Sequence, residues 1–187
     1  PLVLRGARQV GKTTLIRDFG KSYKQFLYLN LEKEAHRAYF ENSDEVPQIV
    51  ESLFLNFNLK SDFSNTLLFI DEIQESPRAI QLLRYFYEEV PELHVISASS
   101  LLEFAMKEIH SFPVGRVTFM YLFPMNFPEF LAAIDHENAS AAFEEIPVKT
   151  VAHQTLQGLF HSYAIVGGMP EVVKSYVESG ILGLSEI

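Results

Sequence analysis

The feature that most constrains the fold of this chain is a glycine-rich stretch close to its start, which fits the pattern G-x-x-x-x-G-K-[ST]. A short apolar run at residues 2–4 precedes it, and a helical pattern over residues 13–19 follows it. In this order of strand, loop and helix, backbone N–H groups and the helix dipole can bind phosphate. The stretch therefore predicts a phosphate-binding loop that holds a nucleotide. The residues expected to line it are Gly6, Ala7, Arg8, Gln9, Val10, Gly11, Lys12, Thr13 and Thr14.

Two side chains of this loop have expected roles of their own. Lys12 is expected to reach the β- and γ-phosphates, and the Thr13 hydroxyl is expected to bind Mg²⁺. The alternative is an ordinary glycine-rich turn that carries a surface lysine. The strand before the loop and the helix after it favour the phosphate loop.

Composition and charge argue against several other classes of protein. With 187 residues, 48% hydrophobic and 21% charged, the chain is long and apolar enough for one well-buried core. Its net charge of -9 argues against non-specific nucleic-acid binding, which usually needs a basic face. No apolar run approaches the roughly 20 residues that span a bilayer, and cysteine is absent, so we expect a cytoplasmic protein without a membrane segment. The histidines lack the spacing of a zinc site, and the opening at Pro1, directly before a strand, suggests a fragment.

The second informative stretch covers residues 66–72, where an apolar run ends in two adjacent carboxylates. Continuous apolar character predicts a strand covered on both faces, as in a parallel sheet. Asp71 is then expected to hold Mg²⁺, and Glu72, aimed differently, to polarise the attacking water. The alternative is a pair of acids that cap the next helix. A phosphate loop requires a metal-binding acid at the end of a neighbouring strand, which favours the first interpretation.

Small hydroxyl residues follow a fourth predicted strand at residues 94–97. Because ligands bind at the carboxyl edge of a parallel sheet, one of these residues could sense the γ-phosphate or the water. Ser97 is the preferred sensor candidate. Ser99 and Ser100 could equally cap a helix at residues 101–106.

An arginine, Arg116, stands between Gly115 and a fifth predicted strand that ends at Tyr121. Its guanidinium could bind phosphate in the same subunit or in a neighbouring one. It could equally be a solvated side chain or a salt-bridge partner. The sequence leaves both interpretations open.

The remaining segments alternate between strand and helix patterns before the chain becomes helical. Aromatic and aliphatic residues predict a strand at residues 25–31, and three-and-four spacing predicts helix within residues 33–60. Pro77 is expected to open a further helix. Later helices are expected at residues 127–134, 139–146, 149–164 and 171–176. These patterns predict an α/β core with a five-stranded parallel sheet over residues 1–135, followed by a helical subdomain over residues 136–187.

Five stretches, taken in order, carry a resemblance to a known family. They are residues 6–13, 69–74 (FIDEIQ), 115–117 (GRV), 123–130 (FPMNFPEF) and 167–172 (GGMPEV). Together they resemble the prokaryotic AAA+-type P-loop ATPases, in which an ATPase domain is followed by a C-terminal domain of unknown function. The resemblance implies an ASCE-type P-loop NTPase core with helices on both faces of a sheet of order 5-1-4-3-2, and ATP and Mg²⁺ as ligands. It also implies that the family's C-terminal domain lies beyond Ile187. One departure is Ser97-Ala98-Ser99, where the family usually has Thr-Gly-Ser.

Two functions are compatible with these residues. The first is an ATPase whose Mg²⁺-dependent hydrolysis drives or times a conformational change in a macromolecular partner. Its catalytic residues would be Lys12, Glu72, Ser97 and Arg116. The second is an ATP-dependent switch or binding module with negligible turnover. A small-molecule kinase is disfavoured, because Glu72 directly after Asp71 suits activation of water better than transfer to a hydroxyl. The expected partners are ATP or ADP, a macromolecule and other copies of the chain, but neither a membrane nor nucleic acid.

Overall fold

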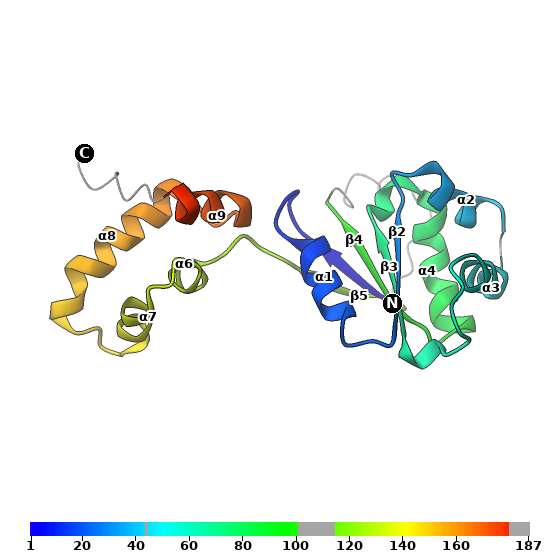
Figure 1. The fold of residues 1–187 in the computed structure, drawn as a ribbon, viewed down its shortest axis with the longest axis horizontal. Coiled ribbons are helices and arrows are strands. Elements are labelled where there is room, and N and C mark those ends of the chain that lie inside the picture. Colours follow the sequence, from blue (N-terminus) through cyan, green and yellow to red (C-terminus); the bar gives the residue numbers. More distant parts are fainter. Residues whose placement is uncertain (44, 101–114, 180–187) are drawn as a thin grey trace. The chain divides into compact units, whose positions relative to one another are not determined.

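The computed structural model describes residues 1–43, 45–100 and 115–179. Contacts within the chain divide it into two compact units, Pro1–Leu122 and Phe123–Ile187. The first unit contains the sheet, and the described part of the second unit is helical (Figure 1).

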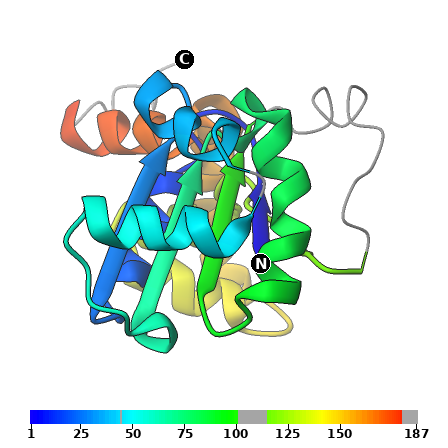
Figure 2. The same ribbon diagram turned by 90° about the vertical axis from the view of Figure 1, so that its right-hand side faces the viewer.

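In the described part of the chain, the first unit is built on a sheet of five parallel strands (Figure 2). They are β1 (Leu2–Arg5), β2 (Gln25–Asn30), β3 (Thr66–Asp71), β4 (His94–Ser99) and β5 (Thr118–Tyr121). The order across the sheet is β2-β3-β4-β1-β5, which confirms the predicted order 5-1-4-3-2. β1 lies between β4 and β5, so the glycine-rich loop follows an inner strand of the sheet.

Helices cover both faces of this sheet, as the resemblance implied (Figure 1). On one face lies α1 (Lys12–Gly20), and on the other lie α2 (Glu34–Glu41), α3 (Val46–Asn56) and α4 (Pro77–Glu89). Short 3₁₀ turns, η1 (Phe63–Asn65) and η2 (Ile73–Glu75), flank β3.

The helical pattern expected within residues 33–60 is divided between α2 and α3. Pro47 stands in the first turn of α3, where a proline is tolerated, whereas inside one long helix it would remove a hydrogen bond and clash with the preceding turn. The chain therefore ends α2 at Glu41 and starts again. The helix expected at residues 101–106 lies outside the described residues.

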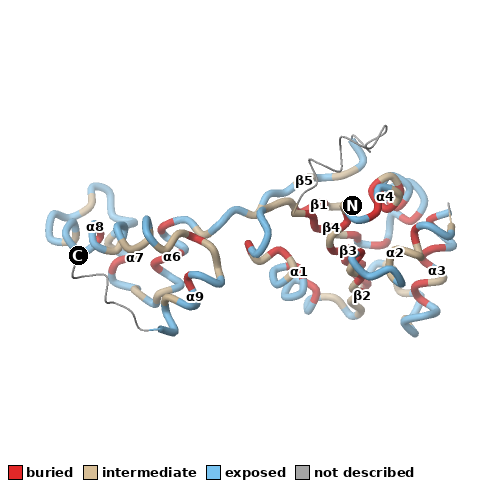
Figure 3. Tube along the Cα trace, turned by 90° about the horizontal axis from the view of Figure 1, so that it is seen from above, coloured by how far each residue is buried: buried red, intermediate tan, exposed pale blue. Residues whose placement is uncertain are grey.

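The inner strand β3, between β2 and β4, is buried along its whole length, as its continuous apolar sequence predicted (Figure 3). Side chains alternate between the faces of a strand. Leu68 and Ile70 accordingly belong to the core beneath α2, α3 and α4, whereas Leu67 and Phe69 pack in the core that contains Ile16 of α1. A strand covered on both faces is held in one register, which fixes where its last residue, Asp71, is placed.

The described helices of the second unit pack around an apolar core of their own. They are α6 (Phe127–Ala133), α7 (Glu137–Glu144), α8 (Thr150–Val166) and α9 (Pro170–Ser179). A capping box starts α6, in which the Asn126 and Glu129 side chains each accept a hydrogen bond from the other's backbone N–H. Phe130 of α6 is fully buried and its ring lies against Tyr163 and Tyr176. Because α6 packs with the later helices, the division between the units falls after Leu122 rather than after residue 135.

Candidate active site

The glycine-rich loop leaves β1 at Arg5 and enters α1 at Lys12. Gly11 turns the chain into the helix with φ 98°, in the left-handed region that glycine favours. At Gly6, a Cβ would lie 2.4 Å from the carbonyl oxygen of Leu122, so only glycine lets these two backbone segments approach. Among the described residues, no side chain caps the N-terminus of α1, so its first N–H groups can bind an anion.

The Lys12 ammonium group lies within this loop. Its Nζ donates hydrogen bonds to the carbonyl oxygens of Gly6 at 2.9 Å and Ala7 at 2.8 Å, and the residue is only 6% exposed. Burial lowers the pKa of Lys12, while the carboxylates of Glu72 and Asp71 oppose that shift. A cation beside backbone N–H groups is suited to neutralising a phosphate.

Asp71 ends β3 at the same edge of the sheet. Its Oδ2 accepts hydrogen bonds from the Thr13 hydroxyl at 2.9 Å and the Tyr28 hydroxyl at 3.1 Å, and its Oδ1 accepts one from the Glu72 N–H at 3.1 Å. Burial raises the pKa of Asp71, although the hydrogen bonds from Thr13 and Tyr28 act in the opposite direction. The structure therefore brings together the two residues expected to bind Mg²⁺, and both present the oxygen ligands that this ion prefers.

Tyr28 is a further residue of this candidate site, and it was not predicted from the sequence. Tyr28 lies on β2, which pairs with β3, and the guanidinium of Arg17 in α1 is 4.4 Å from the centre of its ring. A hydroxyl within a strand of largely apolar residues was the available signal. Its partner could be named only once β2 was known to lie beside β3.

Glu72 follows β3 directly, at a residue where the backbone changes from extended to left-handed (φ 51°, ψ 48°). Its Oε2 accepts hydrogen bonds from the side-chain amide of Gln74 and from the Ser100 hydroxyl at 3.3 Å. The amide oxygen of Gln74 accepts a further hydrogen bond from Ser99 at 2.7 Å. The two adjacent acids thus have separate sets of partners, and a carboxylate held by neutral donors can orient a water molecule.

The family of this chain follows from comparison with known sequences. A family model described as "AAA domain" matches residues 1–131, which is more than half of the chain. The chain belongs to the AAA domain family. Membership of this family supports nucleotide-binding ATPase activity in general.

Solved structures share the fold of this AAA chain. A chain in the structure of Drosophila ORC bound to DNA is similar with a TM-score of 0.51 and 16% identity, over 98% of this chain and 55% of that chain. A Signal Transduction ATPase with Numerous Domains (STAND) protein with a tetratricopeptide repeat sensor, from Pyrococcus horikoshii, is similar with a TM-score of 0.52 and 14% identity. That likeness covers 95% of this chain and 27% of the STAND chain. The AAA chain therefore spans less than two thirds of either protein, and at these identities the likeness concerns the fold alone. No curated protein matches the sequence significantly.

Within the AAA domain, Ser97 does not reach the Glu72 carboxylate. Its hydroxyl donates to the carbonyl oxygen of Leu2 at 3.4 Å, because Ser97 lies inside the sheet, two positions before the end of β4. Ser99 and Ser100 are the serines that bond to Gln74 and Glu72 at the strand's end. The geometry therefore favours Ser99 and Ser100 over the expected Ser97 as the serines of the site.

Arg116 lies at the opposite edge of the sheet from the phosphate loop. It precedes β5, whose first residue, Thr118, donates its backbone N–H to the carbonyl oxygen of Pro1 at 3.0 Å, whereas the loop follows the far end of β1. The Arg116 Nε donates to the Glu88 carboxylate at 3.2 Å, and the arginine side chain is 44% exposed. Arg116 is thus a salt-bridge partner within its own chain and does not reach that chain's phosphate loop.

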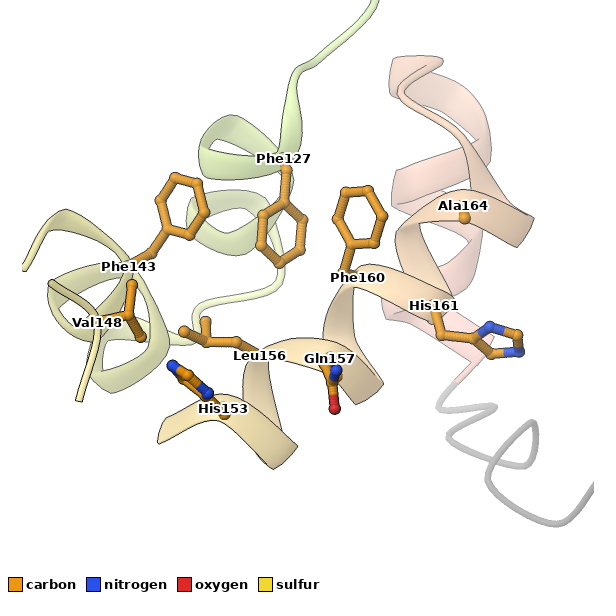
Figure 4. A pocket seen from close by; sticks show the side chains of 9 residues that line it. All are labelled: Phe127, Phe143, Val148, His153, Leu156, Gln157, Phe160, His161 and Ala164. Carbon is orange, nitrogen blue, oxygen red and sulfur yellow. The ribbon is translucent and has the colours of Figure 1, made fainter. Parts of the chain in front are cut away.

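An apolar cavity of about 570 Å³ in the second unit has a different character (Figure 4). The ring of Phe127 is edge-on to those of Phe143 and Phe160 along its wall. The polar side chains in its lining are those of His153, Gln157 and His161. Since it offers neither a lysine nor a carboxylate, this cavity does not have the groups of a phosphate or magnesium site.

Residues 1–43, 45–100 and 115–179 hold no cluster of three or more His, Asp or Glu side chains that could bind a metal. None of their helices combines the length and apolar character needed to cross a membrane.

Proposed function

We propose that this chain binds ATP together with Mg²⁺ and hydrolyses it, and that turnover drives or times a conformational change in a macromolecular partner. The observation that carries the proposal is the meeting of Lys12, the Thr13–Asp71 pair and Glu72 at one edge of the sheet. Hydrolysis of a phosphoanhydride requires a cation for the phosphates, oxygen ligands for magnesium and a carboxylate for water. Membership of the AAA family supports the same function.

Each group that binds the nucleotide has its own task. Lys12 neutralises the β- and γ-phosphates, while the N–H groups of the loop and of α1 bind phosphate oxygens. Thr13 and Asp71 would hold Mg²⁺, which when bound would supply positive charge to the phosphate oxygens. Both residues fit this ion, because the Thr13 hydroxyl already lies 2.9 Å from Asp71 and the carboxylate is buried.

Glu72 is the proposed catalytic base. Its carboxylate orients a water molecule and accepts a proton from it. A bond then forms between the water oxygen and the γ-phosphorus, the bond from that phosphorus to the bridging oxygen breaks, and ADP and phosphate leave. Asp71 is less suited to this role, because its oxygens are bonded to Thr13, Tyr28 and the Glu72 N–H.

Arg116 is proposed to serve the site of a neighbouring copy of the chain. Its half-exposed guanidinium lies at the edge away from its own phosphate loop, where another subunit can be reached. A head-to-tail assembly joins two different surfaces of neighbouring copies, and we propose that this edge of one copy meets the carboxyl edge of the next. The arginine then stabilises the charge that builds up on the transferred phosphoryl group.

The test of the proposed function is the substitution Glu72→Gln, which keeps the size of the side chain and removes the base. We expect ATP affinity to be retained and turnover to fall by about 10²–10⁴-fold, the usual contribution of a general base. Glu75→Gln is the matched control, because Glu75 is an exposed acid on the same 3₁₀ turn. Turnover of Glu72→Gln close to that of the unchanged chain would remove Glu72 from the mechanism.

A second candidate function is an ATP-dependent switch with negligible turnover. The observation that favours it is the placement of Arg116 at the edge of the sheet away from its own phosphate loop, because Arg116 then cannot assist phosphoryl transfer within a single copy. Phosphate release measured over a range of protein concentrations separates the two functions. A specific activity that rises with concentration supports the ATPase, and ATP binding without turnover at any concentration supports the switch.

A further inference from the structure

We propose that Gln74 is a positioning residue that aims the Glu72 carboxylate at the attacking water, an inference that rests on the proposed ATPase function. Gln74 lies in η2, two residues after Glu72, and uses both ends of its side-chain amide. Its Nε2 donates to Glu72 Oε2, and its Oε1 accepts from Ser99 at 2.7 Å. Ser99 is 1% exposed, so the far end of this chain of hydrogen bonds is anchored inside the protein.

The two oxygens of the Glu72 carboxylate differ in their hydrogen bonds. Gln74 and Ser100 both donate to Oε2, and Ser100 does so at 3.3 Å. Among residues 1–43, 45–100 and 115–179, no hydrogen-bond donor reaches Oε1, so its lone pairs are left for a water molecule. A carboxylate bound at one oxygen only is fixed in direction and keeps a basic oxygen for proton transfer.

The pairing of β4 with β1 places this arrangement beside the phosphate loop. Ser99 is the last residue of β4, and in the parallel pairing of β4 with β1 it stands opposite Arg5, the residue before the loop. Gln74 therefore connects the base to the strand end next to which the phosphates are bound. A side chain in η2 and a serine in β4 hold Glu72 relative to the loop.

The start of α4 does not depend on Gln74. Ser76 caps that helix by accepting a hydrogen bond from the Ala79 N–H at 3.2 Å, and Pro77 occupies its first turn. Removal of the Gln74 amide therefore leaves the helix cap in place. Gln74 can be tested for its effect on Glu72 without loss of the element that follows it.

The experiment measures ATP affinity and steady-state turnover of Gln74→Ala in the full chain, at a concentration where the unchanged chain is most active. Turnover is expected to fall about 10- to 100-fold, as for a catalytic group displaced by about 1 Å, while ATP affinity stays the same. In a Glu72→Gln background, Gln74→Ala is expected to cause no further loss, because the group that Gln74 positions is already gone. Glu75→Ala, on the exposed side of the same turn, is the control for a nonspecific effect.

A second variant keeps the inference testable if Gln74→Ala folds poorly. Ser99→Ala leaves the amide in place and removes its anchor, so it should lower turnover by a smaller factor and leave ATP affinity unchanged. If Gln74→Ala and Ser99→Ala hydrolyse ATP like the unchanged chain, or if Gln74→Ala lowers turnover equally in the Glu72→Gln background, the positioning role is wrong. Absence of turnover in the unchanged chain would instead overturn the proposed function, so the two failures are distinguishable.

Discussion

The two edges of the parallel sheet carry charged residues in opposite arrangements. At the carboxyl edge, Lys12 lies inside the phosphate loop and Asp71 bonds to Thr13, so residues far apart in sequence are bonded or in electrostatic contact. At the amino edge, Arg116 is half exposed and its partner is Glu88, which also pairs with Arg84. The first edge therefore holds the residues of the proposed catalytic site, and the second presents the arginine that we propose acts on the site of another copy.

This difference shows how strand direction assigns roles to residues. Parallel strands place their carboxyl ends together, so the loop after β1 and the acids after β3 meet without further help. A residue just before a strand is placed at the other edge, whatever chemistry its side chain could perform. Arg116 is such a residue, so the action that we propose for it takes place between chains and not within one chain.

The largest expected effect tests whether Arg116 acts on the site of a neighbouring chain. In assembled protein, Arg116→Ala should lower turnover about 10³-fold, the lower end of what an arginine supplied to a phosphoryl-transfer site contributes. ATP affinity of the dilute chain should not change, because Arg116 lies away from its own loop. Arg84→Ala is the matched control, since Arg84 pairs with the same carboxylate.

A mixing experiment sharpens this prediction. Arg116→Ala subunits keep Glu72, and Glu72→Gln subunits keep Arg116, so a mixture of the two should recover part of the lost turnover if the arginine acts across subunits. Recovery should be greatest near equal proportions. A mixture no more active than its components would place Arg116 outside the mechanism and leave it as the salt-bridge partner of Glu88.

The next largest effect concerns ATP affinity and Lys12, at the carboxyl edge of the sheet. Lys12→Ala should weaken ATP binding about 10- to 100-fold, because a charge-assisted hydrogen bond is worth about 1.5–3 kcal/mol and each 1.4 kcal/mol is about tenfold in affinity. Calorimetry or a fluorescent ATP analogue measures the change. Lys21→Ala, at an exposed lysine paired with Asp18, should bind ATP normally. Equal affinity for Lys12→Ala and Lys21→Ala would show that this edge does not bind the phosphates.

The smallest expected effect is on stability and depends on pH. Burial raises the pKa of the Asp71 carboxyl above its ordinary value of 3.8, so the folded chain holds this proton more tightly than the unfolded chain. The stability that the protonated form provides is fully present below pH 3.8 and is lost as the pH rises through the raised folded pKa.

Asp71→Asn, measured without Mg²⁺, should therefore match the unchanged chain at low pH and melt a few degrees higher near neutral pH. Thermal unfolding at a series of pH values measures this. A gap in melting temperature that shrinks as the pH rises would contradict the sign of the shift.

The sequence was most informative where a function depends on residues that are adjacent in the chain. The phosphate loop, the apolar strand ending at Asp71 and the sheet order were all predicted, and the structure has that strand and that order. Tyr28 and Gln74 were not selected, because their value lies in contacts with Asp71 and Glu72 that depend on strand pairing and on the left-handed turn at Glu72.

Two expectations differ from the structure for related reasons. Ser97 was preferred over Ser99 because the local sequence does not show at which residue β4 reaches the edge of the sheet. The end of the core was expected at residue 135, but the buried ring of Phe130 packs against Tyr163 and Tyr176, far along the chain. Both depend on tertiary neighbours rather than on local pattern.

The close approach of Gly6 to Leu122 has a mechanical consequence. Leu122 is the final residue of the first unit, and its N–H donates to the carbonyl oxygen of Arg5 at 2.8 Å, while its own carbonyl occupies the space where a Gly6 side chain would begin. The residue that opens the glycine-rich loop and the residue where the chain departs from the sheet therefore cannot shift independently. A bulkier residue at position 6 must displace that departure point, even though it lies more than a hundred positions away in the sequence.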